Sequence, residues 1–440
     1  MSKIVVIGSN HAGIAAINAV LDNSDNEVVV FEKNEVISFL GCGMALWIAD
    51  RINKIDNMFY ANKEALEKKG CKIHFSTEVN DVDFETKTVI ATNKDGETIK
   101  ETYDKLILAT GSVPIIPQLE GSDLENIQRV KLFEDAQVVI DKLDEVKNVT
   151  VIGAGYIGIE LAEAFKIKGK NVTLVDVENT VLPTYYDEKF TDMMKQNLID
   201  NGINLKFGQK VVGFEGDVKV SKVVTDKEKI DADMVIWAVG FLPNSKVLKD
   251  KLETFKNGAY LVNTQQETSQ KDVYAVGDCA TLRYNAIKDT AYIALATNAV
   301  RSGIVAGLNA IGVTLKSIGV QGSNAISIFG LNMISTGVTV NAAKKFGLDV
   351  EYTDHSDLQR EAFMLENEEV HIRIVYEKSS RRVVGAQLVS RYDVSMLINM
   401  FSLAIQKDVT IDEFKLLDIF FLPHFDRAYN YVTVAALQAK

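Results

Sequence analysis

Short apolar runs that end in glycine are the main pattern of the chain. The first run, Ile4–Ile7, meets Gly8, and an Ala- and Ile-rich stretch then continues to Val20. A run this short predicts a buried strand, and the longer stretch after it predicts a helix. A second apolar run, Val28–Phe31, predicts a strand that is followed by the acidic residue Glu32. The order is therefore strand, glycine turn, helix, strand and acid.

The same order returns in the middle of the chain. Val149–Ile152 meets Gly153, a helix is predicted through Phe165, and the next strand ends at Asp176. The acid follows the first glycine after 24 residues in the first copy and after 23 in the second. Both spacings fit the roughly 20 residues that separate the phosphate turn from the ribose-binding acid in a dinucleotide-binding fold. The pattern thus predicts two Rossmann-like units.

Each unit has a matching end and a matching insertion. Residues 103–111 and 232–240 both run through an apolar stretch to a glycine. Residues 87–98 and 211–229 alternate in polarity and contain turn residues, which predicts a small antiparallel meander in each unit.

The pattern changes at about residue 318. Alternating strands are predicted at 334–340, 370–376 and 382–389, followed by amphipathic helices at 394–406 and 411–417. Strands followed by helices indicate an α+β domain. The fold class is therefore α/β, with a first dinucleotide-binding domain at 1–113 and 245–317, a second at 114–244 and a C-terminal domain at 318–440.

The second glycine motif has glycines at all three expected positions, Gly153, Gly155 and Gly158. Such glycines permit a tight turn, and the helix that follows presents its positive end to a pyrophosphate. Asp176 would accept hydrogen bonds from a ribose 2′-OH and repel a 2′-phosphate, and neither Val177 nor Glu178 offers that phosphate a positive charge. The motif favours NADH over NADPH. A solvated acid at the end of a strand is the alternative for Asp176.

The first motif departs from this pattern because Asn10 stands at the second glycine position. Asparagine tolerates unusual backbone angles, so the turn can form. His11 opens the predicted helix beside a bound cofactor, although a histidine that bonds to a loop has equal weight. Two units suggest two dinucleotides, one of them FAD. Asp278, after the short strand at 272–276, can accept hydrogen bonds from a polyol chain or cap a helix.

The chain has three cysteines in 440 residues, Cys42, Cys71 and Cys279. An odd number at wide spacing excludes a disulfide framework and a zinc site, and we expect no metal. Cys42 precedes the apolar stretch 44–49, which predicts a helix, and a helix N-terminus lowers the pKa of a thiol. An inert buried cysteine is the alternative for Cys42 and the interpretation for the other two.

The charge balance narrows the choice of partners. The chain has 48 basic and 60 acidic residues, a net charge of −12, and no basic cluster. Nucleic acid and anionic membranes are therefore poor candidates. No apolar stretch reaches the roughly 18 residues of a membrane span, and the first apolar run is too short for a signal peptide. We expect a soluble cytoplasmic protein.

Together these motifs resemble the single-cysteine branch of the pyridine nucleotide-disulfide oxidoreductases over the whole chain. This branch comprises water-forming NADH oxidases, NADH peroxidases and coenzyme A-disulfide reductases. The matching segments are 8–13, 38–43, 103–111, 153–160, 275–278, 294–301 and 421–426. Gly41 departs from the serine of many members, and Ala325 stands where members commonly have glycine.

The resemblance implies roles for particular residues. Cys42 would cycle between thiolate and sulfenic acid, and His11 would act as its acid and base. FAD contacts are implied at Gly8, Asn10, Ala12, Gly13, Glu32, Lys33, Val79, Ala109, Thr110, Gly111, Ser112, Lys131, Asp278, Leu295, Ala296 and Thr297. NADH contacts are implied at Gly153, Gly155, Tyr156, Ile157, Gly158, Asp176, Tyr185, Gly240 and Ala325. The C-terminal domain would form a homodimer, with residues 421–425, Phe425 included, at the partner's flavin.

The resulting hypothesis is an NADH oxidase that reduces O₂ by four electrons to two waters, through a flavin C4a-peroxide and a Cys42 sulfenic acid. A peroxidase that uses the same cysteine on added H₂O₂ is the nearest alternative. A coenzyme A-disulfide reductase is the next, and a non-catalytic flavin redox sensor is more distant.

Overall fold

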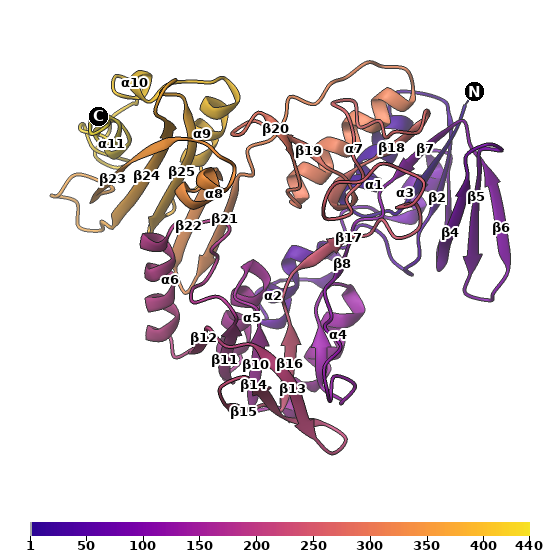
Figure 1. The fold of residues 1–440 in the computed structure, drawn as a ribbon, viewed down its shortest axis with the longest axis horizontal. Helices are drawn as coiled ribbons and strands as arrows, with labels where there is room; N and C mark the ends of the chain where they lie inside the picture. Colours follow the sequence, from indigo (N-terminus) through magenta and orange to yellow (C-terminus); the bar gives the residue numbers. More distant parts are fainter. Residues whose placement is uncertain (1) are drawn as a thin grey trace.

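The computed structural model describes residues 2–440, which form three packed parts (Figure 1). The first part is built on a parallel sheet with the strand order β18-β7-β1-β2-β3. Its strands are β1 (Lys3–Ile7), β2 (Glu27–Phe31), β3 (Cys71–His74), β7 (Lys105–Leu108) and β18 (Val273–Ala275). Its helices are α1 (His11–Leu21), α2 (Met44–Ile48), α3 (Lys63–Lys68) and α7 (Ala296–Ala310), with the 3₁₀ turns η1 (Gly41–Gly43), η2 (Ile55–Met58) and η4 (Gly277–Cys279).

Helices α1 and α7 lie in close contact although they are far apart in the sequence. A Cβ atom at Gly303 would overlap the carbonyl oxygen of Ala12, and one at Gly307 would lie 2.7 Å from that of Ala16. The two glycines therefore let the backbones approach, which packs the helix after the first glycine turn against the helix after Asp278.

The second part repeats the strand order of the first. Its parallel sheet runs β12-β11-β10-β16-β9. Its strands are β9 (Ile127–Arg129), β10 (Asn148–Ile152), β11 (Asn171–Asp176), β12 (Asn204–Phe207) and β16 (Met234–Trp237), and its helices are α4 (Phe133–Lys142), η3 (Leu143–Glu145), α5 (Tyr156–Ile167) and α6 (Glu188–Asp200). The predicted duplication is confirmed by these two matching sheets.

Each unit also carries the expected antiparallel meander. The first is β4 (Thr77–Asp83), β5 (Thr88–Asn93) and β6 (Thr98–Thr102), and the second is β13 (Val211–Gly216), β14 (Val220–Thr225) and β15 (Lys229–Asp231). The chain passes between the units twice, as the antiparallel pair β8 (Ser112–Pro114) and β17 (Phe241–Pro243). The predicted domain boundaries at residues 113 and 244 fall in or beside this pair.

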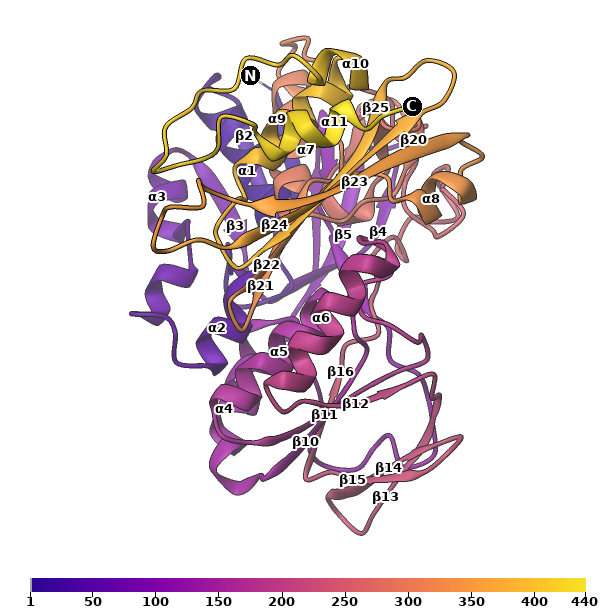
Figure 2. The same cartoon turned by 90° about the vertical axis from the view of Figure 1, so that its left-hand side faces the viewer.

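The C-terminal domain is an antiparallel sheet with helices on one face (Figure 2). The strand order is β21-β22-β25-β24-β23, and the short pair β19 (Leu282–Tyr284) and β20 (Asp289–Ala291) precedes it. The strands are β21 (Asn324–Ile328), β22 (Leu331–Gly337), β23 (Val350–Leu358), β24 (Glu369–Glu377) and β25 (Val383–Ser390). The helices are α8 (Val340–Lys345), α9 (Leu397–Gln406), α10 (Ile411–Phe414) and α11 (Tyr431–Leu437).

Four predicted element ends in this domain are wrong by three residues each, the first of them the start of the strand predicted from Ile334, which begins at Leu331. The strand predicted through Val340 ends at Gly337, because the Thr339 hydroxyl accepts a hydrogen bond from Ala342 N–H at 3.0 Å and starts α8. The helix predicted from Val394 starts at Leu397, and the one predicted through Leu417 ends at Phe414. The polar strand β23 and helix α11 were not predicted.

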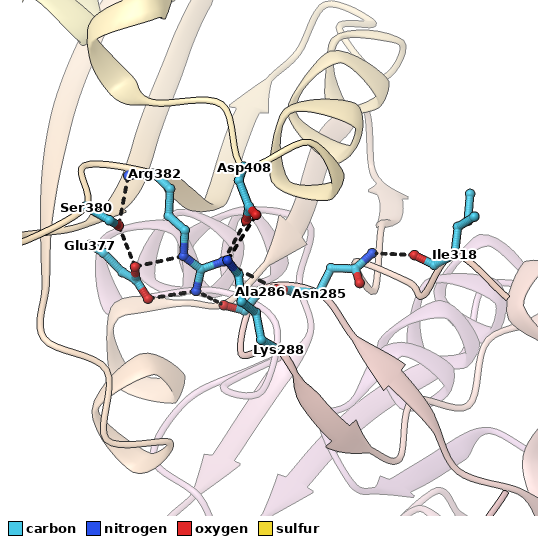
Figure 3. Close-up of polar contacts among 8 residues, drawn as sticks. All are labelled: Asn285, Ala286, Lys288, Ile318, Glu377, Ser380, Arg382 and Asp408. Atoms are coloured by element: carbon cyan, nitrogen blue, oxygen red, sulfur yellow. Dashed lines mark hydrogen bonds and ion pairs between the residues drawn. The ribbon is translucent and has the colours of Figure 1, made fainter. Parts of the chain in front are cut away.

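A buried arginine joins the C-terminal domain to the β19–β20 hairpin (Figure 3). Arg382 Nε and Nη2 each donate to a Glu377 carboxylate oxygen at 2.7 Å. The same side chain donates to the backbone oxygens of Ala286 at 2.7 Å and Asn285 at 3.4 Å, and it pairs with Asp408 at 3.3 Å. Two carboxylates and two carbonyls therefore hold one guanidinium, which crosses the boundary between the domains.

A second buried group joins the C-terminal domain to the second unit. The Asp187 carboxylate accepts from Gln387 Nε2 at 2.7 Å and pairs with Arg373 at 3.2 Å. Asp187 N–H donates in return to Gln387 Oε1 at 2.7 Å.

Over residues 2–440, no helix is both long and apolar enough to cross a membrane.

Candidate active site

Cys42 lies in η1, immediately before α2, on a segment that Ser38 holds to the first glycine turn. Ser38 is fully buried and has a φ of +57°. Its N–H donates to Ser9 O at 3.0 Å, its hydroxyl donates to Ala61 O at 2.8 Å, and Ala61 N–H donates back to that hydroxyl at 2.9 Å. A positive φ costs a non-glycine residue about 1 kcal/mol or more. These bonds offset that cost and fix the backbone that leads to Cys42.

The exposure of the three thiols separates Cys42 from the others. Cys42 is exposed, whereas Cys71 and Cys279 are buried, and all three are free. Cys71 belongs to β3, and Cys279 Sγ donates to Val276 O at 3.1 Å. The prediction that these two are inert core residues agrees with their burial, and Cys42 has no second thiol to pair with.

The predicted low pKa of Cys42 is wrong. Part of the Cys42 residue faces solvent, but the protein around the sulfur partly withdraws the thiol from water and so raises its pKa, and the nearby charge of Glu160 raises it further. Lys131 opposes this shift but does not reverse it. Helix α2 has only five residues, so its N-terminus stabilises the thiolate by less than the loss of water around the sulfur destabilises it. Formation of the Cys42 thiolate therefore needs a base nearby.

His11 is the first residue of α1, and Tyr60 holds it in place. The two rings stack with centroids 5.2 Å apart and planes 4° from parallel. The Tyr60 hydroxyl also donates to Asn10 Oδ1 at 3.1 Å, so one side chain contacts both residues of the turn. Burial lowers the pKa of His11, with Asp278 opposing and Lys131 adding to the shift. His11 is therefore neutral at pH 7 and can accept a proton.

Removal of the Tyr60 ring is expected to raise the pKa of His11. In Tyr60→Ala the imidazole loses its stacking partner and gains water, so its pKa moves up toward the ordinary value of about 6.5. An NMR titration of the histidine ring protons measures this shift, and the chain has only five histidines. Tyr60→Phe keeps the ring and is the control. An unchanged His11 pKa in Tyr60→Ala would show that the stack does not shield the imidazole.

A chain of polar side chains connects β8, η4 and the segment before α4. Lys131 Nζ donates to Ser112 Oγ at 3.0 Å, and Ser112 Oγ donates to Asp278 Oδ2 at 2.8 Å. Lys131 also lies over the Phe241 ring at 4.3 Å. Lys131 and Asp278 both shift the pKa of His11 and that of Cys42. The structure thus brings together five predicted residues from five separate segments: His11, Cys42, Ser112, Lys131 and Asp278.

The first unit has the features that an FAD molecule requires. Gly8 has a φ of +98°, and a Cβ atom at Gly13 would overlap the carbonyl oxygen of Gly8. The buried Glu32 carboxylate accepts from Ser9 N–H at 2.9 Å, which ties the acid to the turn. A Cβ atom at Gly111 would meet nothing within 4 Å, so the backbone there borders open space. These residues fit a dinucleotide that approaches the turn closely.

The second unit has the same turn, with open space at its middle glycine. A Cβ atom at Gly158 would overlap the carbonyl oxygen of Gly153, whereas one at Gly155 would meet nothing within 4 Å. Space above Gly155, at the N-terminus of α5, fits a pyrophosphate. Asp176 accepts from Ala154 N–H at 2.6 Å and from Glu178 N–H at 2.8 Å. The acid therefore lies beside the turn, where the NADH prediction requires it.

Three tyrosines gather beside this turn and face the C-terminal domain. Tyr156 begins α5, and its ring makes an edge contact with Tyr185 at 4.7 Å between centroids. The Tyr156 and Tyr186 hydroxyls lie 3.0 Å apart, and both donate to Asn324 Oδ1. Ala325 is exposed on the other face of β21. The residue of this strand that contacts the tyrosines is therefore Asn324.

Glu160 lies one helical turn after Tyr156. Burial, followed by the charge of Glu163, raises the pKa of Glu160 to about 7. A substantial fraction of this carboxyl group is therefore protonated at neutral pH. Helix α5, which carries Glu160, packs against α2, the helix that follows Cys42, so Glu160 belongs to the boundary between the two units.

The remaining predicted residues lie along the same two units, except Phe425, which lies in the C-terminal domain. Val79 is buried in β4, Lys33 is exposed after Glu32, and residues 295–297 begin α7. Ile157 is in α5, and Gly240 has a φ of +104° before β17. Phe425 is 56% exposed in the C-terminal domain, where its carbonyl oxygen accepts from Gln359.

Comparisons with known proteins agree with this architecture. Residues 2–303 match the pyridine nucleotide-disulphide oxidoreductase family, and residues 324–432 match its dimerisation domain. The chain belongs to this family. The predicted resemblance is thereby confirmed, and the chain is a flavin-dependent oxidoreductase with FAD and NADH as its cofactors.

Individual relatives cover nearly the whole chain. An NADH oxidase of Streptococcus pneumoniae is 54% identical over 459 residues and covers 100% of both chains. A water-forming NADH oxidase from Lactobacillus brevis, solved with NADH bound, has a TM-score of 0.97 at 38% identity, covering 99% of this chain and 98% of its own. An NAD-dependent persulfide reductase from A. fulgidus has a TM-score of 0.95 at 28% identity, covering 99% and 82%. Fold alone therefore does not fix the electron acceptor in this family.

The sequence did not point to Tyr60, Glu160 or Asn324 as site residues. Tyr60 stands in an irregular segment, and no pattern there relates it to His11. Glu160 belongs to the matching segment 153–160, so the presence of an acid there could be read from the sequence. Its effect on the pKa of Cys42 depends on the packing of α5 against α2, which the sequence does not show. Asn324 stands beside Ala325, and only the strand alternation shows which of the two faces the tyrosines.

Proposed function

We propose that the protein is a water-forming NADH oxidase that catalyses 2 NADH + 2 H⁺ + O₂ → 2 NAD⁺ + 2 H₂O. The observation that carries the proposal is a single exposed thiol, Cys42, at a site between two dinucleotide units, with Cys71 and Cys279 buried elsewhere. The name of the Lactobacillus brevis neighbour and the 54% identity to the Streptococcus pneumoniae relative support it.

The residues that would hold FAD are those of the first unit. Glu32 and the Gly8 turn fit its adenosine and pyrophosphate, and Asp278, Ser112 and Lys131 fit its ribityl chain and ring. When bound, FAD accepts a hydride from NADH and passes electrons on to oxygen and to Cys42. The Gly153 turn and Asp176 would hold NADH on the second unit, so that the two nucleotides meet between the units.

Cys42 supplies the step that completes the reduction to water. Its thiolate attacks one oxygen of a peroxide formed by two-electron reduction of O₂: Cys–S⁻ + H₂O₂ → Cys–SOH + OH⁻. The O–O bond breaks and the sulfur is oxidised by two electrons. The second NADH then provides the electrons for Cys–SOH + 2 e⁻ + H⁺ → Cys–S⁻ + H₂O. Each turnover thus returns the thiolate, and the sulfenic acid is a reversible oxidation state.

His11 moves the protons of these steps. Burial keeps it neutral, so it can take the proton that the raised pKa leaves on the Cys42 thiol. It can return that proton to the hydroxide that leaves, which forms the first water. Lys131 favours the thiolate through its positive charge. The raised pKa of Cys42 makes this base necessary.

The C-terminal domain would complete the site in a homodimer. It matches a dimerisation domain and exposes large apolar residues near the chain end. These are Leu416, Phe420, Phe421, Leu422, Phe425 and Tyr429. Their exposure in one subunit is explained if a second copy covers them, with Phe425 at the partner's flavin.

The stoichiometry of the reaction tests the proposal. We expect two NADH consumed per O₂, with no H₂O₂ released, when oxygen and peroxide electrodes follow the reaction together. Turnover only when H₂O₂ is supplied would make the protein an NADH peroxidase. Turnover only with a disulfide would make it a coenzyme A-disulfide reductase, and absence of steady-state turnover would favour a flavin redox sensor.

A further inference from the structure

The amide oxygen of Asn324 is the point where the C-terminal domain holds the tyrosines of the second unit. Asn324 Oδ1 accepts from the hydroxyls of Tyr156 and Tyr186 and from Ser335 Oγ at 3.1 Å. Asn324 Nδ2 donates to Gly322 O at 2.7 Å, which fixes the orientation of the amide. Every polar atom of this side chain therefore has a partner, and three of the four partners are hydroxyl groups.

The acceptor belongs to a different domain from the two tyrosines that use it. Asn324 starts β21 and pairs with Ser335 of β22, so both residues are fixed by the C-terminal sheet. Tyr156 starts α5, and fully buried Tyr186 lies ten residues after Asp176. The position of the Tyr156 ring thus depends on how the C-terminal domain docks on the second unit.

The docking at this place is fixed by a second, independent contact. Asp187, the residue after Tyr186, is held by Gln387 and Arg373 of the same C-terminal sheet. Leu182 turns the chain before the tyrosines with a φ of +52°, and its N–H donates to Ala154 O at 3.0 Å. The segment that carries Tyr185 and Tyr186 is therefore tied to the glycine turn at one end and to the C-terminal domain at the other.

The tyrosines lie between the two nucleotide sites. Tyr156 directly follows Gly155, above which the second unit is open. On the other side, helix α5, which Tyr156 begins, packs against α2, the helix of the first unit that follows Cys42. The Tyr156–Tyr185 pair thus stands where the second unit meets the first, on the path that a nicotinamide would take from the turn toward FAD.

We propose that Asn324 is a positioning residue for hydride transfer: it holds the Tyr156 hydroxyl so that the ring sets the nicotinamide position. The inference rests on the proposed use of NADH at the second unit. The C-terminal domain thereby contributes to the nucleotide site of its own chain, in addition to dimerisation. The residue acts through Tyr156 and touches no reacting atom.

Binding of two nucleotides that share an adenosine end tests the proposal on the FAD-loaded dimer. Asn324→Leu removes the acceptor at similar volume, and Asn324→Asp keeps an oxygen acceptor in the same place. Loss of one hydrogen bond predicts about ten-fold weaker NAD⁺ binding in the leucine variant. ADP-ribose, which lacks the nicotinamide, is expected to bind with unchanged affinity in calorimetry, and the aspartate variant is expected to recover most of the NAD⁺ affinity.

A double variant separates the mechanism from a general loss of structure. In a Tyr156→Phe background the hydroxyl is absent, so Asn324→Leu is expected to weaken NAD⁺ binding by less than two-fold. Equal weakening of NAD⁺ and ADP-ribose, or full additivity with Tyr156→Phe, would overturn the proposal.

Anaerobic stopped-flow reduction of the flavin by NADH gives a second readout. The reduction rate at saturating NADH is expected to fall about ten-fold in Asn324→Leu. An unchanged rate together with unchanged NAD⁺ affinity would also overturn the role of Asn324. If NADH failed to reduce the wild-type flavin, the proposed function itself would be wrong, whereas NAD⁺ binding would still report on Asn324.

Discussion

Replacement of Cys42 with serine is expected to change the product of the reaction from water to hydrogen peroxide. A serine hydroxyl cannot accept an oxygen atom as a thiolate does, so the peroxide formed by two-electron reduction of O₂ leaves the site. The NADH consumed per O₂ is expected to fall from two to one, with one H₂O₂ released for each O₂. Oxygen and peroxide electrodes, run on the same sample, measure both ratios.

Variants at the other two thiols are matched controls for this result. Cys71→Ala and Cys279→Ala remove buried sulfurs that lie outside the proposed chemistry. Both are expected to keep two NADH per O₂, although each loses some stability through the cavity it leaves. If Cys42→Ser still produced water with two NADH per O₂, the sulfenic acid mechanism would be wrong.

Replacement of Arg382 with methionine is expected to destabilise the C-terminal domain strongly. The guanidinium is buried, and its loss leaves the Glu377 carboxylate without a positive partner, with only the Ser380 hydroxyl still donating to it, and removes the side-chain donor of the Ala286 carbonyl (Figure 3). Removal of one partner from a buried ion pair costs about 3–5 kcal/mol in the free energy of unfolding. Urea denaturation followed by far-UV circular dichroism measures this loss.

The neighbouring arginine provides the control. Arg381 pairs with Asp412 near the surface and donates to Lys440 O, and none of its side-chain hydrogen bonds reaches the β19–β20 hairpin. Arg381→Met is expected to lose much less stability, because water replaces its partners. Similar losses in the two variants would mean that the contacts of Arg382 do not hold the domains together.

Local pattern was sufficient to predict the two dinucleotide units but not all of their assembly. The turns at Gly8 and Gly153 combine strand, glycine and helix signals within a few residues, so each element was identifiable. Strand β18 completes the first sheet from a position far along the chain, and no local signal shows that pairing. Strand β23 was missed because its sequence, Val350–Leu358, is mostly polar and its pairing with β24 supplies its stability.

Motifs and the family resemblance were enough to name candidate site residues, but not to predict the electrostatics around them. Cys42 and His11 were identified from motifs, whereas the pKa of Cys42 was predicted in the wrong direction. The rule for a helix N-terminus is local, and it was outweighed by burial and by the charge of Glu160, which belongs to the other unit. Tyr60 and Asn324 act through contacts across segments, which a single sequence does not display.

The hydrogen bonds of Asp176 have a consequence for anyone who redesigns the nucleotide preference of this protein. The carboxylate accepts from the Ala154 N–H, so it also holds the glycine turn to the end of β11. A substitution that admits a 2′-phosphate by removing the negative charge leaves that N–H without its charged acceptor, a loss of about 1.5–3 kcal/mol. A successful NADPH variant must therefore replace an anchor of the turn as well as reverse a charge.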